Sequence, residues 1–223
     1  GFITYLGKDT YGDLISSLLK EVNFKHLRIK NSDLPTLHAL VLKDNSGDRT
    51  IIALEPTEMN QLGVEVSDIK QGDIFVFSIW RSEYKAILDD LNNKGVICVV
   101  GASALEDNEV CAAHVVGSKR DFKNIDINSA KSRFENIVIT DAENGAVLHS
   151  KSHTIHQDSL ASEVKDATGA GDSFLAGYVL SLAKGLSNEA SLYLASAWAA
   201  SALVYNSSLP PTWPEVRNRW GLQ

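Results

Sequence analysis

Apolar residues in the middle of the chain come in short continuous runs, and an amphipathic stretch follows the first run. Runs of this kind occupy residues 73–79, 96–100, 110–116 and 137–140. Residues 84–91 repeat apolar positions at the spacing of a helix. Continuous apolar strands that alternate with helices are typical of a parallel sheet covered on both faces. The pattern predicts an α/β fold, in which ligands bind at the carboxyl ends of the strands.

The first fifty residues follow a different pattern. Residues 1–7 have the composition of a strand, and a turn at 6–13 leads into a helix. The predicted apolar face of that helix consists of Leu14, Ile15, Leu18, Leu19 and Val22. Two β-rich runs at 37–42 and 49–54 flank the polar segment 43–48, and this arrangement predicts a β-hairpin.

Residues 166–185 combine a loop of small residues with a helix. The apolar positions of the helix are Phe174, Leu175, Tyr178, Val179 and Leu182. Lys184 and Gly185 are ordinary signals for the end of a helix. Asp172 and Ser173 lie at its start, where a side-chain oxygen can cap free backbone amides.

The small-residue loop suits an anion. Gly169, Ala170 and Gly171 let a ligand approach the backbone closely, and the amides that follow belong to the positive end of a helix. A carboxylate at Asp172 would repel a phosphate, but it has a role if it takes a proton from a hydroxyl that then attacks phosphorus. A glycine-rich turn with Asp172 as the N-cap is the simpler interpretation, and the residues alone leave it open.

Two common phosphate motifs do not fit this loop. No Gly-Lys-Ser/Thr follows it, so it is not a P-loop. Phe174 stands where a dinucleotide fingerprint has its third glycine.

Composition narrows the class of protein. The chain has 223 residues, enough for one domain or for one domain with a small appendage. Its net charge of −7 argues against nucleic acid or an anionic membrane as a partner. We find no apolar run long enough to cross a bilayer and no signal peptide. Cys98 and Cys111 lie in apolar stretches without metal-type spacing, so we expect buried thiols in a cytoplasmic protein.

The segment Asp166-Ala167-Thr168-Gly169-Ala170-Gly171-Asp172-Ser173-Phe174 resembles the signature of the ribokinase-like (PfkB) carbohydrate kinases. The resemblance implies a three-layer α/β/α fold with a mainly parallel sheet and a small β lid. It also implies ATP-dependent phosphorylation of a sugar hydroxyl with Mg²⁺. In that reaction Asp172 would be the general base, and the amides of Gly169, Ala170 and Gly171 would form the anion hole.

The same resemblance implies an ATP site with two departures from the family pattern. Thr140 and Gly145 match a Thr-x-Gly-x-x-Gly turn beside the triphosphate, but Ala142 replaces its first glycine. A β-carbon at this position could crowd the phosphates, or it could be tolerated if φ is negative. Ser118 and Asp121 stand where the family has Asn-x-x-Glu, which orients magnesium through water. A helix cap is an equally good interpretation of Ser118 and Asp121.

Asp166 and Thr168 match family positions that bind a monovalent cation such as K⁺ near the anion hole. Asp166 could equally form a turn, and that alternative stays open. The spacing of His149, His153 and His156 is compatible with a metal site, but they lack a Glu or Asp general base in helical register, so polar loop residues are the preferred interpretation.

The resemblance also implies how the chain divides into a kinase core and a lid. Residues 27–60 are expected to form the β lid, and residues 1–26 and 61–223 the α/β kinase core. A lid of this kind excludes water and often pairs with a second copy, so we expect a homodimer through the lid. The family begins with a strand and a sugar-binding loop that this chain lacks, and because the chain does not begin with Met we expect a fragment. The segment 75–80 is similar to the fructoselysine/fructosamine kinase branch.

Two functions other than an ATP-dependent sugar kinase remain open. The chain could be a catalytically degenerate relative that binds nucleotide or sugar, as the missing loop, Ala142 and the Ser118/Asp121 pair suggest. It could also be a kinase of a small non-sugar alcohol.

Overall fold

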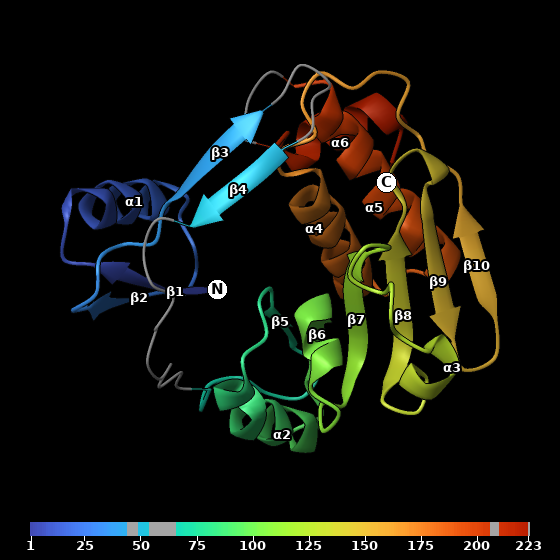
Figure 1. Ribbon diagram of the computed structural model, residues 1–223, viewed down its shortest axis with the longest axis horizontal. Coiled ribbons are helices and arrows are strands. Elements are labelled where there is room, and N and C mark those ends of the chain that lie inside the picture. The colour runs from blue at the N-terminus through green and yellow to red at the C-terminus, as the bar shows by residue number, and fades with distance from the viewer. Residues whose placement is uncertain (44–48, 54–65, 206–209, 223) are drawn as a thin grey trace. The chain divides into compact units, whose positions relative to one another are not determined.

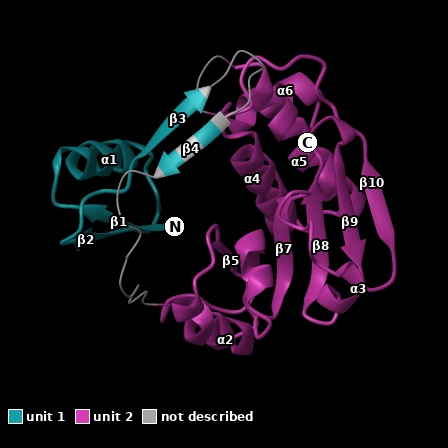
Figure 2. Ribbon diagram, in the orientation of Figure 1, with its two compact units in different colours: residues 1–65 teal, residues 66–223 magenta. Residues whose placement is uncertain are grey.

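The computed structural model describes residues 1–43, 49–53, 66–205 and 210–222. The chain divides into two compact units, residues 1–65 and 66–223, shown in Figure 2. Each unit has its own sheets, so each is described by itself.

The first unit contains a parallel strand pair, a helix and a hairpin. β1 and β2 pair in parallel, with Phe2 opposite Leu27 and Gly7 opposite Ser32. β3 and β4 pair antiparallel, with Ala39 opposite Ala53. The elements are β1 (Phe2–Gly7), α1 (Thr10–Glu21), β2 (Leu27–Ser32), β3 (Ala39–Lys43) and β4 (Arg49–Ala53). The hairpin strands are confirmed, whereas the predicted turn at 44–48 and much of the predicted lid lie outside the described residues.

Asp9 fixes the turn between β1 and α1. Its carboxylate caps the helix by accepting a hydrogen bond from the Gly12 amide at 2.8 Å. The same carboxylate accepts from the Thr36 amide at 2.6 Å and from the Thr36 hydroxyl at 2.8 Å. These hydrogen bonds, led by the Thr36 amide, lower the pKa of Asp9. The loop after β2 is thereby tied to the start of α1.

Helix α1 forms where the sequence predicts it, but its predicted apolar face is only partly buried. Ile15 and Leu19 are half-buried. Leu14, Leu18 and Val22 are each more than half exposed. The helical spacing therefore predicted the helix correctly, but it did not predict which of the side chains are buried.

The second unit holds a six-stranded, mainly parallel sheet (Figure 1). The strand order is β10-β9-β8-β7-β6-β5; β5 to β8 run parallel, and β9 and β10 are antiparallel to their neighbours. The strands are β5 (Ile74–Phe77), β6 (Ile97–Gly101), β7 (Ala112–Ser118), β8 (Phe134–Thr140), β9 (Ala146–Ser150) and β10 (Thr154–Gln157). The predicted strands at 73–79, 96–100, 110–116 and 137–140 are all present. Cys98 in β6 is buried as predicted, but Cys111 is exposed because it precedes the first residue of β7, so the prediction of a buried thiol is wrong there.

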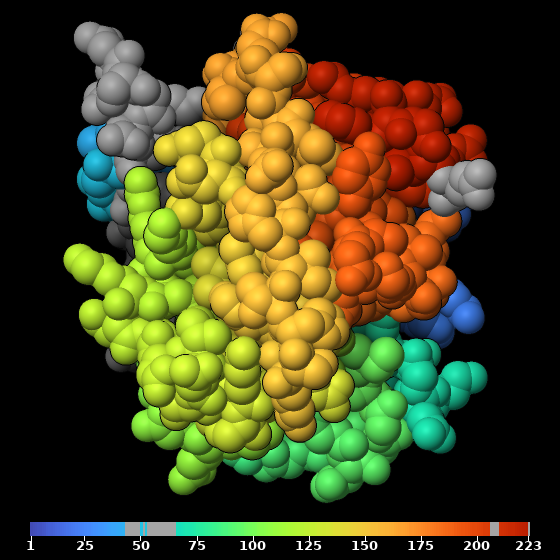
Figure 3. Space-filling model, turned by 90° about the vertical axis from the view of Figure 1, so that its right-hand side faces the viewer, coloured from blue at the N-terminus to red at the C-terminus, as the bar shows by residue number. Residues whose placement is uncertain are grey.

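Helices and short turns complete the unit. The helices are α2 (Lys85–Asn93), α3 (Ile127–Ala130), α4 (Ala170–Ala183), α5 (Asn188–Leu203) and α6 (Trp213–Trp220). The 3₁₀ turns are η1 (Ser82–Tyr84), η2 (Ala102–Glu106) and η3 (Ala142–Asn144). Figure 3, turned to face the right-hand side of Figure 1, shows the helices near the C-terminus gathered on one side of the outer strand β10. Within the described residues, no helix combines the length and apolarity that a membrane span requires.

Both faces of the sheet are buried, as the apolar runs predict. Val99, Val116 and Val138 belong to a core cluster with Phe174 and Tyr178 of α4. The side chains that alternate with them in β6, β7 and β8 therefore point to the opposite face. These alternate residues are fully buried too: Val100, Val115 and Ile137. The three-layer α/β/α fold is confirmed.

Helices α4 and α5 pack closely through small residues. Gly177 of α4 is buried, and a β-carbon there would lie 2.9 Å from the Cα of Ala195 in α5. Ser173 and Ser181 of α4 are also buried on this side. The close approach holds α4, and with it the loop at its N-terminus, in a fixed place against the sheet.

Candidate active site

The loop that leads into α4 is shaped by its own hydrogen bonds. Thr168 donates its amide to the Asp166 carboxylate at 2.8 Å, which makes a turn. The amides of Lys165 and Asp166 donate to the carbonyl of Leu203, at the end of α5, at 2.8 and 3.2 Å. The turn-forming interpretation of Asp166 is thus confirmed, and the cation role of Asp166 and Thr168 stays a prediction.

Gly169 begins α4 in a left-handed conformation, with φ of 74°. Its carbonyl accepts hydrogen bonds from the amide and the hydroxyl of Ser173, both at 2.9 Å. The N-cap is therefore Gly169, and the prediction that Asp172 or Ser173 caps the helix is wrong. The left-handed residue starts the helix three positions earlier, which places Asp172 inside the first turn.

Asp172 is exposed in that first turn, beside the open backbone of Gly171. A β-carbon added at Gly171 would meet nothing within 4 Å, so a ligand can reach this part of the helix N-terminus. The first amides of a helix have no acceptor within the helix. Part of the predicted anion hole already has a partner, because Ala170 donates to the Ala167 carbonyl at 3.3 Å.

The structure brings Ser118, Asp121, Thr140 and Gly145 to one edge of the sheet. Ser118 and Thr140 are register partners at the ends of β7 and β8. Asp121 accepts hydrogen bonds from the Ser118 amide at 2.7 Å and from the Ser118 hydroxyl at 2.8 Å, both on Oδ2. In this arrangement Ser118 and Asp121 close a turn on each other.

The turn after β8 is strained at Ala142, which has φ of 45°. The condition under which the alanine would be tolerated, a negative φ, is therefore not met. The alternative, that its β-carbon crowds the phosphates, stays a prediction. A left-handed conformation costs a residue with a β-carbon about 1–2 kcal/mol. Gly145 also has positive φ, 86°, and a β-carbon there would lie 2.0 Å from the Gln157 carbonyl oxygen. The turn keeps a backbone that suits glycine at both positions, although alanine occupies one of them.

An ion pair that the sequence did not reveal joins the two loops. Lys119 Nζ lies 2.6 Å from Asp141 Oδ2, and the Lys119 amide donates to the Thr140 carbonyl at 2.8 Å. Opposite charges directly after two neighbouring strands were the available signal. The ion pair can be predicted only when the register of β7 against β8 is known, and this register does not follow from the sequence alone.

Both groups of residues lie at the carboxyl edge of the second unit's sheet. Figure 1 shows the N-terminal end of α4 on the same side as the ends of β7 and β8. This edge is where open α/β sheets bind ligands. The predicted anion hole, Asp172 and the predicted nucleotide residues thus share one side of one unit.

The three histidines make local hydrogen bonds. His149 contacts Thr154 Oγ1 at 3.0 Å, His153 contacts Ser150 Oγ at 3.0 Å, and His156 lies 3.2 Å from the Asp158 carboxylate. Among the residues with described placement, no three metal-ligating side chains gather at one point. The expectation of polar loop residues is correct for His153 only, because His149 lies in β9 and His156 in β10.

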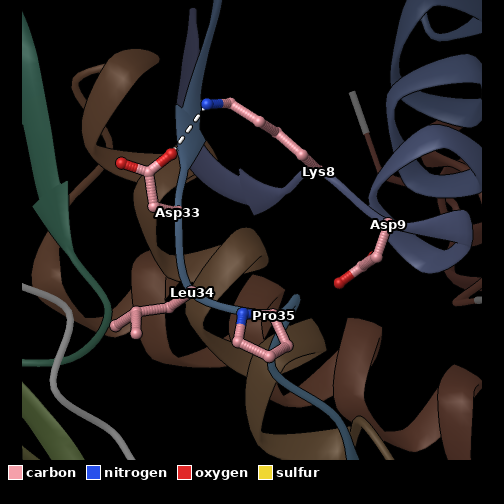
Figure 4. A pocket seen from close by; sticks show the side chains of 5 residues that line it. All are labelled: Lys8, Asp9, Asp33, Leu34 and Pro35. Atoms are coloured by element: carbon pink, nitrogen blue, oxygen red, sulfur yellow. Dashed lines mark hydrogen bonds and ion pairs between the residues drawn. The ribbon is translucent and has the colours of Figure 1, made fainter.

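A small hollow of about 220 Å³ in the first unit is lined by side chains that the sequence did not mark as a site. Figure 4 shows Lys8 reaching toward Asp33, and the two form an ion pair at 2.7 Å. The other lining residues are Asp9, Leu34 and Pro35. Asp9 is engaged with Thr36 and Gly12, so the hollow owes its shape to the turn described above.

Known proteins resemble the chain in both fold and sequence. A solved ribokinase structure from Thermotoga maritima matches with a TM-score of 0.81 at 18% identity, covering 99% of this chain and 80% of that one. Arabidopsis thaliana ribokinase, solved with ribose and ATP, matches with a TM-score of 0.79 at 19% identity, covering 97% of this chain and 80% of that one. Phosphofructokinase-2 from Escherichia coli, solved with potassium, matches with a TM-score of 0.78 at 17% identity, covering 98% of this chain and 80% of that one. By fold, the chain is a ribokinase-like α/β protein.

The sequence matches point to one family within that fold. Residues 108–214 match the model of the pfkB family carbohydrate kinases. Curated relatives include ribokinase from Arabidopsis thaliana, 25% identical over 97% of this chain, and the bifunctional protein HldE of Campylobacter fetus subsp. fetus, 28% identical over 98%. The resemblance to the ribokinase-like (PfkB) carbohydrate kinases is confirmed. The chain spans 65% and 54% of the length of these two relatives.

Proposed function

We propose that the protein is an ATP-dependent carbohydrate kinase that phosphorylates a sugar hydroxyl. The observation that carries the proposal is the exposed Asp172 in the first turn of α4, beside the open backbone of Gly171. A carboxylate next to free helix amides is unfavourable for anion binding alone, and it becomes useful when a hydroxyl must lose its proton beside a phosphate. The family match covers this segment.

In the proposed reaction, Asp172 accepts the proton of the sugar hydroxyl as that oxygen attacks the terminal phosphorus of ATP. The bond between this phosphorus and the bridging oxygen breaks, and ADP leaves. Amides of Gly169, Ala170 and Gly171 stabilise the charge that develops on the transferred group. Because the Ala170 amide also bonds to Ala167, Gly171 is the position with the most open approach.

The nucleotide is assigned to the ends of β7 and β8. Thr140 and Gly145 would line the phosphates, and the positive φ angles of the turn let its backbone face a ligand. Ser118 and Asp121 supply oxygen atoms of the kind that bind hydrated magnesium, so this donor set fits the ion. Bound Mg²⁺ would neutralise negative charge on the phosphates.

Asp166 and Thr168 remain the proposed residues for a monovalent cation. The Asp166 carboxylate already receives the Thr168 amide, which fixes its orientation toward the loop. The potassium complex of Escherichia coli phosphofructokinase-2 is a precedent among proteins with this fold.

The β3–β4 hairpin is proposed as the lid, with residues 27–60 as its bounds and pairing between two lids as the source of a homodimer. Leu40, Val41, Leu42 and Ile52 are exposed on this hairpin. Exposed apolar residues on a two-stranded hairpin are suited to contact with a sugar or with a second hairpin. In the structure β2 pairs with β1, so residues 27–32 would join the lid to the core.

The test is ADP release by the purified protein with MgATP and K⁺, against a panel of sugars and amino-sugar adducts. Asp172→Asn is measured beside it, with Glu135→Gln, an exposed carboxylate at the start of β8, as the matched control. Sugar-dependent turnover that is lost in Asp172→Asn and kept in Glu135→Gln would support the proposal. Turnover that survives in Asp172→Asn would overturn the assignment of the base.

A second candidate is a degenerate protein that binds nucleotide or sugar without catalysis. The strain at Ala142 and the mutual hydrogen bonds of Ser118 and Asp121 favour it. Binding of MgATP in calorimetry, with no ADP formed from any sugar, would establish this function. ADP formation with a non-sugar alcohol alone would instead identify a kinase of that alcohol.

A further inference from the structure

Lys119 is attached to the end of β8 at two points. Its backbone amide donates to the Thr140 carbonyl at 2.8 Å, and its side chain pairs with Asp141 at 2.6 Å. Lys119 itself belongs to the loop after β7, between Ser118 and Asp121. The two attachments therefore join the loops that follow two neighbouring strands.

Asp141 is in turn connected to the rest of its own loop. The oxygen that meets Lys119 also accepts from the Asn144 side-chain amide at 3.3 Å. The Asp141 amide donates to the Gly145 carbonyl at 2.7 Å, and the Asn144 amide donates to the Asp141 carbonyl at 2.8 Å. The carboxylate of Asp141 thus sits at the centre of the turn and not at its margin.

This turn needs restraint, because Ala142 follows Asp141 directly and holds a left-handed conformation. A non-glycine residue stays in such a conformation only where the surrounding structure fixes it. The Lys119 side chain is 68% exposed and that of Asp141 is 28% exposed, so the pair gives little to overall stability. Its consequence is local: it limits how the two loops move relative to each other.

We propose that Lys119 and Asp141 are positioning residues that hold the two loops in the arrangement that binds a magnesium–nucleoside triphosphate. The inference rests on the proposed function, and neither residue is assigned a step in the chemistry. The pair carries no net charge, so it acts through geometry and not by attracting phosphate. Loss of either side chain leaves only the backbone bond from Lys119 to Thr140, so the turn around Ala142 is less restrained relative to the Ser118–Asp121 side of the site.

The experiment measures steady-state kinetics in MgATP for Lys119→Met, Asp141→Asn and the charge-exchanged double variant Lys119→Asp/Asp141→Lys. The control is Lys123→Met, an exposed lysine in the same loop. We expect each single variant to raise KM for MgATP about three- to fivefold, the upper part of the range for an exposed ion pair, with kcat within about twofold. The double variant restores the pair and should return KM to within about twofold of the wild type.

A second measurement separates this inference from the proposed function. Calorimetry with the magnesium complex of a non-hydrolysable ATP analogue reports binding alone, and thermal melts confirm that each variant is folded. Single variants that bind as tightly as wild type would overturn the inference and leave the kinase intact. Weak binding in the double variant, where an aspartate replaces the lysine, would show that Lys119 contacts phosphate directly and would overturn the positioning role. A wild-type protein that binds no nucleotide would overturn the nucleotide site itself.

Discussion

The two halves of the proposed site are built in opposite ways. At the start of α4 the backbone is open: Gly169 is left-handed, Gly171 has space around it, and Asp172 is exposed. At the ends of β7 and β8 the polar side chains bond to one another, as Ser118 does to Asp121 and Lys119 to Asp141. The first half follows the family motif in full, and the second departs from it. Where the motif residues are replaced, hydrogen bonds and ion pairs within the chain take over the shaping of the loops.

The largest expected effect concerns the open half. Asp172→Asn should lower kcat about 10²- to 10⁴-fold, the usual contribution of a general base, while nucleotide affinity changes little. Single-turnover ADP formation and calorimetry on the same sample measure both quantities. Equal losses in binding and turnover would mean that the carboxylate holds the loop together and is not the base.

Gly145→Ala tests whether the turn after β8, in the second half of the site, has room for a β-carbon. The new β-carbon would meet the Gln157 carbonyl oxygen at 2.0 Å in a residue with φ of 86°. We expect a loss of about 2–4 kcal/mol in the free energy of unfolding, together with weaker MgATP binding. Urea unfolding checks the first part, and Gly72→Ala, also at positive φ but in open space, is the control. Equal losses in the two variants would show that φ alone matters and that the contact with Gln157 does not.

His114 links β7 to α4 away from both halves of the site, because its Nδ1 lies 3.0 Å from the Tyr178 hydroxyl. Burial lowers the pKa of His114 to about 4 and raises the pKa of Tyr178 above its usual range. An unfolded histidine has a pKa near 6.5, so the unfolded state binds the proton first as the pH falls. The free energy of unfolding should therefore drop by about 2 kcal/mol between pH 7 and pH 5.

Denaturant titrations at several pH values measure this loss. His114→Gln should flatten it, since glutamine keeps a polar group beside Tyr178 but cannot titrate in this range. An unchanged pH profile in this variant would mean that other groups cause the loss.

The smallest effect is expected at Ala142. Replacing it with glycine removes about 1–2 kcal/mol of left-handed strain, but glycine gains entropy in the unfolded chain. The net result should be a rise in the free energy of unfolding of about 0.5–1 kcal/mol, with MgATP affinity equal to or above that of the wild type. Loss of both stability and affinity would show that the methyl group packs usefully and that the departure from the motif is an adaptation.

The sequence predicted the second unit better than the first. The apolar runs of β6, β7 and β8 place buried residues on both faces of the sheet, and a pattern of that kind depends only on local residues. In β5 only Phe77 is buried, and Val76 is exposed. The apolar spacing of α1 was equally clear, yet Leu14 and Leu18 are exposed, because burial depends on which element lies opposite. The parallel pairing of β2 with β1 was missed for the same reason.

Within the site, residue types were predictable and conformations were not. The nine-residue motif identified Asp172 and the small residues before it. Ala142 takes a positive φ within a turn that is closed by the backbone bonds of residues 141–145, and its residue type did not predict this. The pair of Lys119 with Asp141 depends on a contact between neighbouring strands, 22 residues apart in the sequence. Such contacts depend on strand register, which cannot be derived from a local sequence pattern.

Three of the four tryptophans lie together in α5 and α6, and this gives the protein a built-in optical reporter. The Trp198 indole donates to the Pro211 carbonyl at 3.0 Å, and its ring centroid lies 5.8 Å from that of Trp213. The Trp220 indole donates to the Ser201 hydroxyl at 2.8 Å, two residues before Leu203. Because Leu203 anchors the loop that leads to Gly169, the intrinsic fluorescence of the unlabelled protein samples the neighbourhood of the proposed phosphate site.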